Sequence, residues 1–172
     1  MFVLGHVGIA FAIFFLIIKW KPEWQPKFDI RWLALGIMLP DMIDKTIGLL
    51  IFRQYIDNGR IYAHTLIFSL ALSVLAGHFR NRWAVSISFG AWTHLAFDRM
   101  WEVPETLFWP ALRLDFPRTD FDPSRWIEIL LTDPYVYISE IVGAGILLVM
   151  FFYFGMYRWD KFKQVFASGR FV

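Results

Sequence analysis

Residues 83–101 read WAVSISFGAWTHLAFDRMW, an apolar stretch that carries His94 and Asp98 near its end. A transmembrane helix needs about 20 mainly apolar residues, so this stretch is long enough to cross a bilayer. An ionisable side chain at the centre of a membrane helix costs about 2.5–3.5 kcal/mol on insertion scales, and it is retained mainly where it faces a partner or a cavity. The stretch therefore predicts a membrane helix that ends at a functional site.

Four further stretches of similar character lie along the chain, at residues 2–20, 32–52, 61–79 and 135–157. The chain is 58% hydrophobic and 20% aromatic, which is well beyond the composition of an ordinary soluble domain. Residues 2–20 are expected to remain as an anchor, because they lack a basic leader and an A-x-A-like cleavage site. We therefore predict an all-α polytopic integral membrane protein with about five transmembrane helices, which forms a single domain over residues 1–172.

The stretch 32–52 is interrupted by four residues that disfavour a continuous apolar helix, namely Pro40, Asp41, Asp44 and Lys45. A broken helix is tolerated at membrane depth only where protein or a wet cavity satisfies the freed backbone groups. Proline is well suited to the first turn of a helix. We therefore expect the helix to break near Pro40, with a new half-helix that begins near Asp41 and borders a cavity.

Basic residues predict the orientation of these helices. They gather in three connections, at Lys19, Lys21, Lys27 and Arg31, at Arg80 and Arg82, and at Arg158, Lys161, Lys163 and Arg170. These connections share one side of the membrane if all five stretches cross it, and basic loops favour the cytoplasmic side. We therefore predict an integral protein of the cell (inner or plasma) membrane, with its N-terminus and the acidic loop 103–134 outside the cytoplasm.

The same topology brings six metal-type side chains to one side of the membrane, the extracytoplasmic one. They are His6, Asp41, Asp44, His64, His94 and Asp98. This common level depends on the number of crossings and not on their orientation. Imidazole and carboxylate together suit Zn²⁺, Mn²⁺ or Fe²⁺, and the chain has no cysteine that could supply a thiolate. The pattern predicts a divalent metal cofactor, with zinc as the first choice and manganese or iron as alternatives.

The motifs around these residues also resemble a known family. They are Gly5-His6, Leu39-Pro40-Asp41-Met42-Ile43-Asp44-Lys45, Ala63-His64-Thr65-Leu66, His94-Leu95-Ala96-Phe97-Asp98 and Trp109-Pro110, in this order. Together they resemble the membrane-bound metal-dependent hydrolases, a family of YdjM-like inner-membrane proteins, over roughly residues 1–115. The resemblance implies a metal-dependent hydrolase whose site contains the six side chains above. Where better-known members read Leu-Pro-Asp-Ile-Asp-His, this chain inserts one residue and has Lys45 in place of the histidine.

We therefore expect hydrolysis of a lipid-like ester or phosphoester that enters from the bilayer, through a metal-activated water. Asp44 or Glu102 is the expected general base. Lys45 or Arg99 is expected to stabilise the developing negative charge. The expected partners are the membrane and a lipid-like substrate. The charge pattern gives no nucleic-acid footprint, and nothing in the sequence identifies a protein partner.

Several alternatives stay open at this level. The chain could be a non-catalytic membrane protein, either a metal or ion carrier or a subunit of a larger complex, in which the polar cluster binds a cation or holds helices together. Loop 103–134, with an amphipathic piece near residues 125–131, could be a lid or a docking surface. Glu140 could pair with Arg99, contact a metal-bound water or be protonated. His78, at the opposite end of its stretch, is expected to be interfacial and remote from the site.

Overall fold

The computed structural model describes residues 1–119 and 122–170, and all regular secondary structure in those ranges is helical. The helices are α1 (Val3–Trp20), α2 (Ile30–Lys45), α3 (Leu66–Phe79), α4 (Arg82–Phe97), α5 (Pro104–Leu107), α6 (Pro123–Thr132), α7 (Pro134–Tyr153) and α8 (Trp159–Ser168). Short 3₁₀ turns occupy Pro22–Lys27, Tyr62–His64 and Met100–Glu102, and a π-helical turn occupies Thr46–Ile51. The predicted all-α class is confirmed for this part of the chain.

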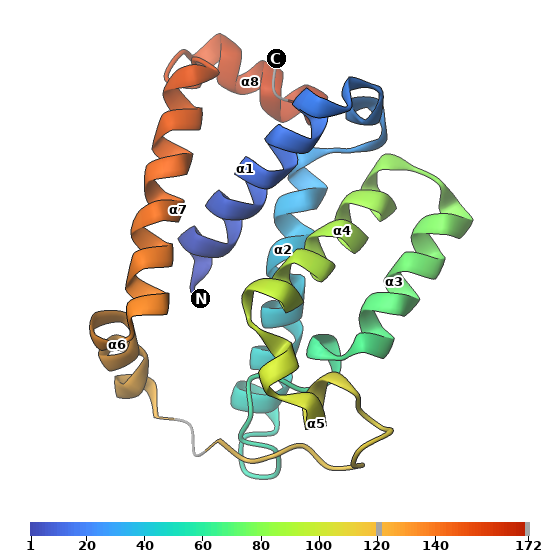
Figure 1. Cartoon of the computed structure of the whole chain (residues 1–172), viewed down its shortest axis with the longest axis vertical. Coiled ribbons are helices and arrows are strands. Elements are labelled where there is room, and N and C mark those ends of the chain that lie inside the picture. The colour runs from blue at the N-terminus through green and yellow to red at the C-terminus, as the bar shows by residue number, and fades with distance from the viewer. Residues whose placement is uncertain (120–121, 171–172) are drawn as a thin grey trace.

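Two close helix pairs form the centre of the bundle. α1 lies along α7, α2 lies along α4, and α3 follows on the outer side of α4 (Figure 1). Glycines allow both approaches: a Cβ atom added to Gly8 would lie 2.2 Å from the carbonyl oxygen of Gly143. A Cβ atom added to Gly90 would lie 2.6 Å from the backbone nitrogen of Ile37. Small residues at helix contacts are characteristic of membrane bundles, in which close van der Waals packing replaces the hydrophobic effect.

Glu140 of α7 closes the start of α1. Its carboxylate accepts hydrogen bonds from the backbone N–H groups of Phe2, Leu4 and Gly5, at 2.8, 3.0 and 3.0 Å. These donors would otherwise be unpaired at a helix N-terminus, where negative charge is also favoured. A side chain at position 5 would meet the carboxylate at 2.6 Å, so Gly5 leaves it room. The pairing of Glu140 with Arg99 considered above is wrong, because Glu140 serves as a helix cap.

The predicted break near Pro40 is also wrong. α2 continues through Pro40 to Lys45 and widens only afterwards, in the π-helical turn Thr46–Ile51. Proline removes one backbone N–H from a helix, and its ring crowds the preceding turn. The loss of this one hydrogen bond does not end α2. The Ile37 carbonyl oxygen in the same turn also accepts a hydrogen bond from His94 Nδ1 at 2.7 Å, which joins α2 to α4 beside the proline.

Two helices, α1 and α7, are long and apolar enough to cross a membrane. Only 22% of the most apolar 18-residue stretch of α7 is buried within the protein, so most of this helix is free to face lipid. α3 is apolar but has 14 residues, and α2 and α4 have 16 residues each. The structure thus supports two candidate spans, and the other three predicted spans stay predictions.

The glycine contact between α1 and α7 gives the first prediction. Gly143→Ala should lower the melting temperature of the detergent-solubilised protein, because its Cβ atom would lie 2.2 Å from the Leu4 carbonyl oxygen. Overpacking of this kind costs about 1–3 kcal/mol. Gly145→Ala is the matched control on the same helix, since nothing lies within 4 Å of its added Cβ atom. Equal melting temperatures for the two variants would contradict the tight contact.

Candidate metal centre

Four metal-type side chains meet at one end of the α2–α4 pair. They are Asp41 of α2, His64 of the 3₁₀ turn before α3, His94 of α4 and Asp98 directly after α4. Each offers one ligand atom, and these atoms all lie within 4.8 Å of one another. Both imidazoles are fully buried, whereas the Asp41 side chain is 18% exposed. Residues from three separate elements thus form a cluster that can hold a metal ion.

Hydrogen bonds on the outer nitrogens define the state of the imidazoles. Nδ1 of His94 lies 2.7 Å from the Ile37 carbonyl oxygen, and Nδ1 of His6 lies 2.7 Å from the Phe2 carbonyl oxygen. A carbonyl only accepts, so each Nδ1 must carry the hydrogen. In the neutral ring Nε2 then keeps its lone pair, which is the arrangement found in metal-binding histidines. His64 has the corresponding contact, between its Nδ1 and Asp44 Oδ2 at 2.7 Å.

The inner nitrogens of His64 and His94 converge beside Asp41. Nε2 of His64 and Nε2 of His94 are 3.1 Å apart. Asp41 Oδ1 lies 3.6 Å from the first and 3.8 Å from the second. Lone pairs and carboxylate oxygens repel one another at such distances unless a cation or a shared proton lies among them. The two-nitrogen, two-carboxylate set fits a divalent transition metal.

Asp44 lies behind His64 rather than within the cluster of four. Its fully buried carboxylate accepts hydrogen bonds from the backbone N–H groups of Ile61, Ala63 and His64 and contacts His64 Nδ1. Both oxygens are occupied by these donors. These contacts position His64 and the turn that carries it, and the metal-ligand and general-base roles expected of Asp44 stay predictions.

His6 lies immediately beside the four. Its Nε2 is 3.2 Å from Asp98 Oδ1 and has no hydrogen-bond partner within the described part of the chain. Its ring stacks on His94, with 4.4 Å between the ring centres. The structure thus brings His6 to the edge of the cluster, as the topology predicted, and its role as a ligand stays a prediction.

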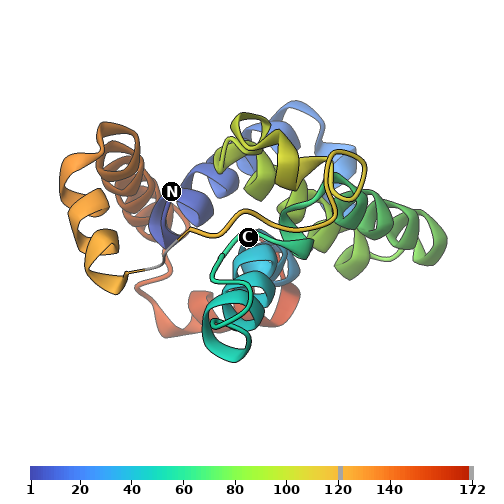
Figure 2. The same cartoon turned by 90° about the horizontal axis from the view of Figure 1, so that it is seen from below.

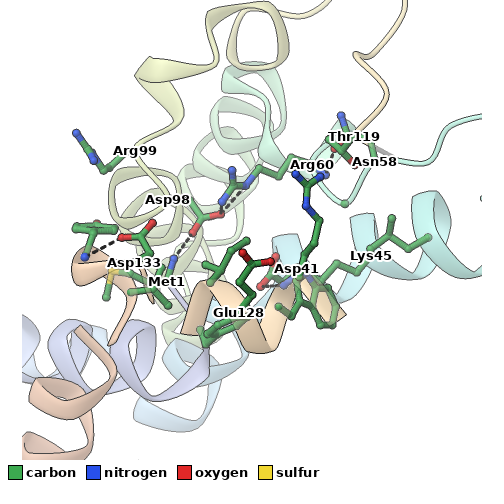
Figure 3. A pocket seen from close by; sticks show the side chains of 18 of the residues that line it. Met1, Asp41, Lys45, Asn58, Arg60, Asp98, Arg99, Thr119, Glu128 and Asp133 are labelled. Carbon is green, nitrogen blue, oxygen red and sulfur yellow. Dashed lines mark hydrogen bonds and ion pairs between the residues drawn. The ribbon is translucent and has the colours of Figure 1, made fainter. Parts of the chain in front are cut away.

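Asp98 is surrounded by hydrogen-bond donors and positive charge. Arg60 approaches Oδ2 with both Nε and Nη2 at 2.9 Å, and the Met1 amine lies 3.2 Å from Oδ1 (Figure 3). Arg60 and the Met1 amine thus place positive charge beside both oxygens of this carboxyl group. The Arg60 contact was not foreseen, although Arg60 stands only four residues before His64.

The other predicted catalytic residues are less central. Lys45 Nζ lies 2.6 Å from Asp41 Oδ2 and 5.3 Å from the ring centre of Trp126, so it neutralises a carboxylate of the cluster. Arg99 and Glu102 form an ion pair with each other, and both are about half exposed. Figure 3 shows the Arg99 side chain directed away from Asp98. Both residues line the same cavity as Asp41 and Asp98 but lie outside the group of four metal-type side chains.

A cavity of about 600 Å³ opens onto the cluster through Asp41 and Asp98. Its wall includes residues from the end of α2, the start of α1, and α6, and the chain after α5 crosses this end of the bundle (Figure 2). Its volume is within the range of roughly 300–1,000 Å³ that is common for small-molecule sites. His78 lies in the last turn of α3 with its ring against Phe79, away from this cavity. A small molecule can therefore approach the metal-type side chains from outside.

The fold is a helical bundle that has two candidate membrane spans and a largely buried histidine–aspartate cluster at one end. The chain belongs to the YdjM inner membrane protein family, whose model matches residues 1–163. This match extends beyond the motifs of the first 115 residues and includes α6 and α7. No curated protein and no solved structure matches the chain.

Asp44 and Asp41 should respond differently to truncation. Asp44→Ala leaves the buried N–H groups of the 61–64 turn unpaired, and each such loss costs about 1–3 kcal/mol. We expect the free energy of unfolding to fall by about 3 kcal/mol or more, measured by denaturation in detergent. Asp41→Ala should cost clearly less, because its partner Lys45 is 34% exposed and can turn to solvent. Equal losses would contradict the structural role of Asp44.

Proposed function

We propose that the protein is a membrane-bound metal-dependent hydrolase that acts on a lipid-like ester or phosphoester. One observation carries the proposal: Nε2 of His64 and Nε2 of His94 face each other at 3.1 Å beside two carboxylates. A cation or a shared proton among these atoms would stabilise the group, and it lies beside a cavity that a substrate could enter.

The ion would be held by Asp41, His64, His94 and Asp98, and His6 would be a further ligand on the Asp98 side. Zinc is the first choice for this set, and manganese or iron are the alternatives. A bound divalent ion supplies Lewis acidity and lowers the pKa of water. Asp44 and the Ile37 carbonyl oxygen orient His64 and His94 for this purpose.

The remaining roles fall to residues of the cavity wall. Lys45 and Arg60 each pair with a carboxylate of the cluster, so their charges are placed to stabilise an anionic group beside it. In the proposal Arg60 therefore takes the part first given to Arg99. Glu102, which also lines the cavity, is the proposed proton acceptor, because the carboxylate of Asp44 is fully hydrogen-bonded.

The proposal also includes five membrane crossings, with α2, α3 and α4 between α1 and α7 and the metal centre outside the cytoplasm. Exposed apolar side chains on α3, such as Leu70 and Val74, support a lipid-facing position for this helix. The basic connections at the other end of the bundle support the orientation. Lipid could then approach the cavity from within the bilayer.

Topology can be tested cleanly because the chain contains no cysteine. In intact cells, an impermeant maleimide should label Gln54→Cys and Glu105→Cys, whereas Glu23→Cys and Lys163→Cys should react only after permeabilisation. If α1 and α7 were the sole spans, positions 23, 54 and 105 would all react alike. That pattern would contradict the five crossings.

Metal content and hydrolysis test the proposed function. The purified protein should contain a divalent metal by elemental analysis, and His64→Ala and His94→Ala should each lower its amount at least tenfold. His78→Ala is the matched control and should keep it, because His78 lies outside the cluster. Lipid hydrolysis should be lost on chelation and in Asp98→Asn, which keeps the side-chain shape but removes the charge.

The outcomes separate the alternatives. Metal content that is the same in all three histidine variants would contradict the metal centre. Metal bound without hydrolysis of ester or phosphoester lipids would contradict the hydrolase and favour a carrier. Hydrolysis that survives in folded Asp98→Asn would contradict a role of this carboxylate in the reaction.

A further inference from the structure

An apolar groove of about 500 Å³ adjoins the metal-site cavity. It lies between the start of α1, one face of α6 and α7, with Phe2, Leu4, Trp126, Leu130, Ile141 and Ala144 in its wall. Phe2 and Trp126 also line the metal-site cavity, and their rings meet edge to face with centres 6.4 Å apart. The two hollows therefore share this pair of rings as a common wall.

The groove offers nothing to a polar occupant. Glu140 is the one ionisable residue in its lining, and its carboxylate is already bonded to three N–H groups at the start of α1. The remaining lining side chains are apolar. Ile127 and Ile141 at its edge are 65% and 68% exposed, so the groove opens along the lipid-facing side of α7. Its chemistry fits a hydrocarbon chain.

The other side of the ring pair carries positive charge. Lys45 lies over the Trp126 ring, and Arg60 approaches Asp98. Both cations are paired with carboxylates of the metal cluster, and a metal ion on those carboxylates would leave the two cations available to an anion. An anionic group in the cavity and an apolar chain in the groove would therefore both be matched.

We propose that the substrate is an anionic lipid, bound with its head group beside the metal centre and one acyl chain in the groove between α6 and α7. This inference rests on the proposed function and specifies its substrate class. It also assigns α6 a role: Trp126 and Leu130 of this helix form a wall of the lipid site.

Photo-crosslinking tests the inference without requiring turnover. The metal-loaded protein in nanodiscs receives phosphatidylglycerol with a diazirine on one acyl chain, and mass spectrometry locates the adducts. We expect adducts concentrated at Ile127, Leu130 and Ala144. Ala144→Trp fills the groove and should lower these adducts at least fivefold. Val149→Trp, on an exposed position of the same helix, is the matched control and should leave them unchanged.

A second variant guards against misfolding at the half-buried position 144. Leu130→Glu changes the exposed helix α6, and it should also lower the groove adducts while the melting temperature stays unchanged. A phosphatidylcholine probe with the same chain should give fewer adducts than phosphatidylglycerol, and Lys45→Met should remove this preference. These results would support both halves of the lipid site.

Three results would overturn the inference. Adducts spread evenly over the exposed faces of α1 and α7 would show bulk lipid contact only. Unchanged groove adducts in both Ala144→Trp and Leu130→Glu would exclude the chain position. A dimer in detergent that both variants dissociate would assign the groove to a second copy of the chain. Because binding is measured, absence of hydrolysis affects the proposed function alone, and hydrolysis without groove adducts contradicts this inference alone.

Discussion

The buried carboxylate of Asp44 is the contact on which the geometry of the centre depends. It joins the end of α2 to the 61–64 turn, and it contacts Nδ1 of the histidine that this turn carries. A turn between helices has many conformations, and three backbone N–H groups bound to one carboxylate select a single one. His64 is thereby directed toward His94 with its Nε2 side forward. The position of one ligand thus follows from a side chain that is not itself in the cluster.

The second constraint is the close contact of α2 and α4. Gly36 and Gly90 let the backbones approach, and only then can His94 reach the Ile37 carbonyl oxygen. The same bond joins the turn before Pro40 to α4. Helix packing and imidazole orientation therefore depend on each other. A larger residue at position 90 would disturb both.

Much of this was predictable from sequence, and the exceptions have a common cause. Hydrophobic length and composition predicted the helices, and alternating topology predicted that the six polar residues meet at one end. The spacing could not distinguish the roles of Asp44 and Asp98, because these depend on partners far along the chain: the 61–64 turn and Arg60. The capping role of Glu140 was missed for the same reason, since its partners lie about 135 residues away. Only the tertiary fold supplies such partners.

The two cations beside the cluster connect the proposed metal centre to the proposed lipid site. Asp41 pairs with Lys45, and Asp98 pairs with Arg60. A divalent ion bound to the same two carboxylates would leave positive charge in excess. The excess positive charge would then favour an anion in the cavity, so metal and anionic substrate should each strengthen the binding of the other. Trp126 lies beneath Lys45 and also forms a wall of the apolar groove. One aromatic side chain thus stands where the charged and the hydrocarbon parts of a lipid would meet.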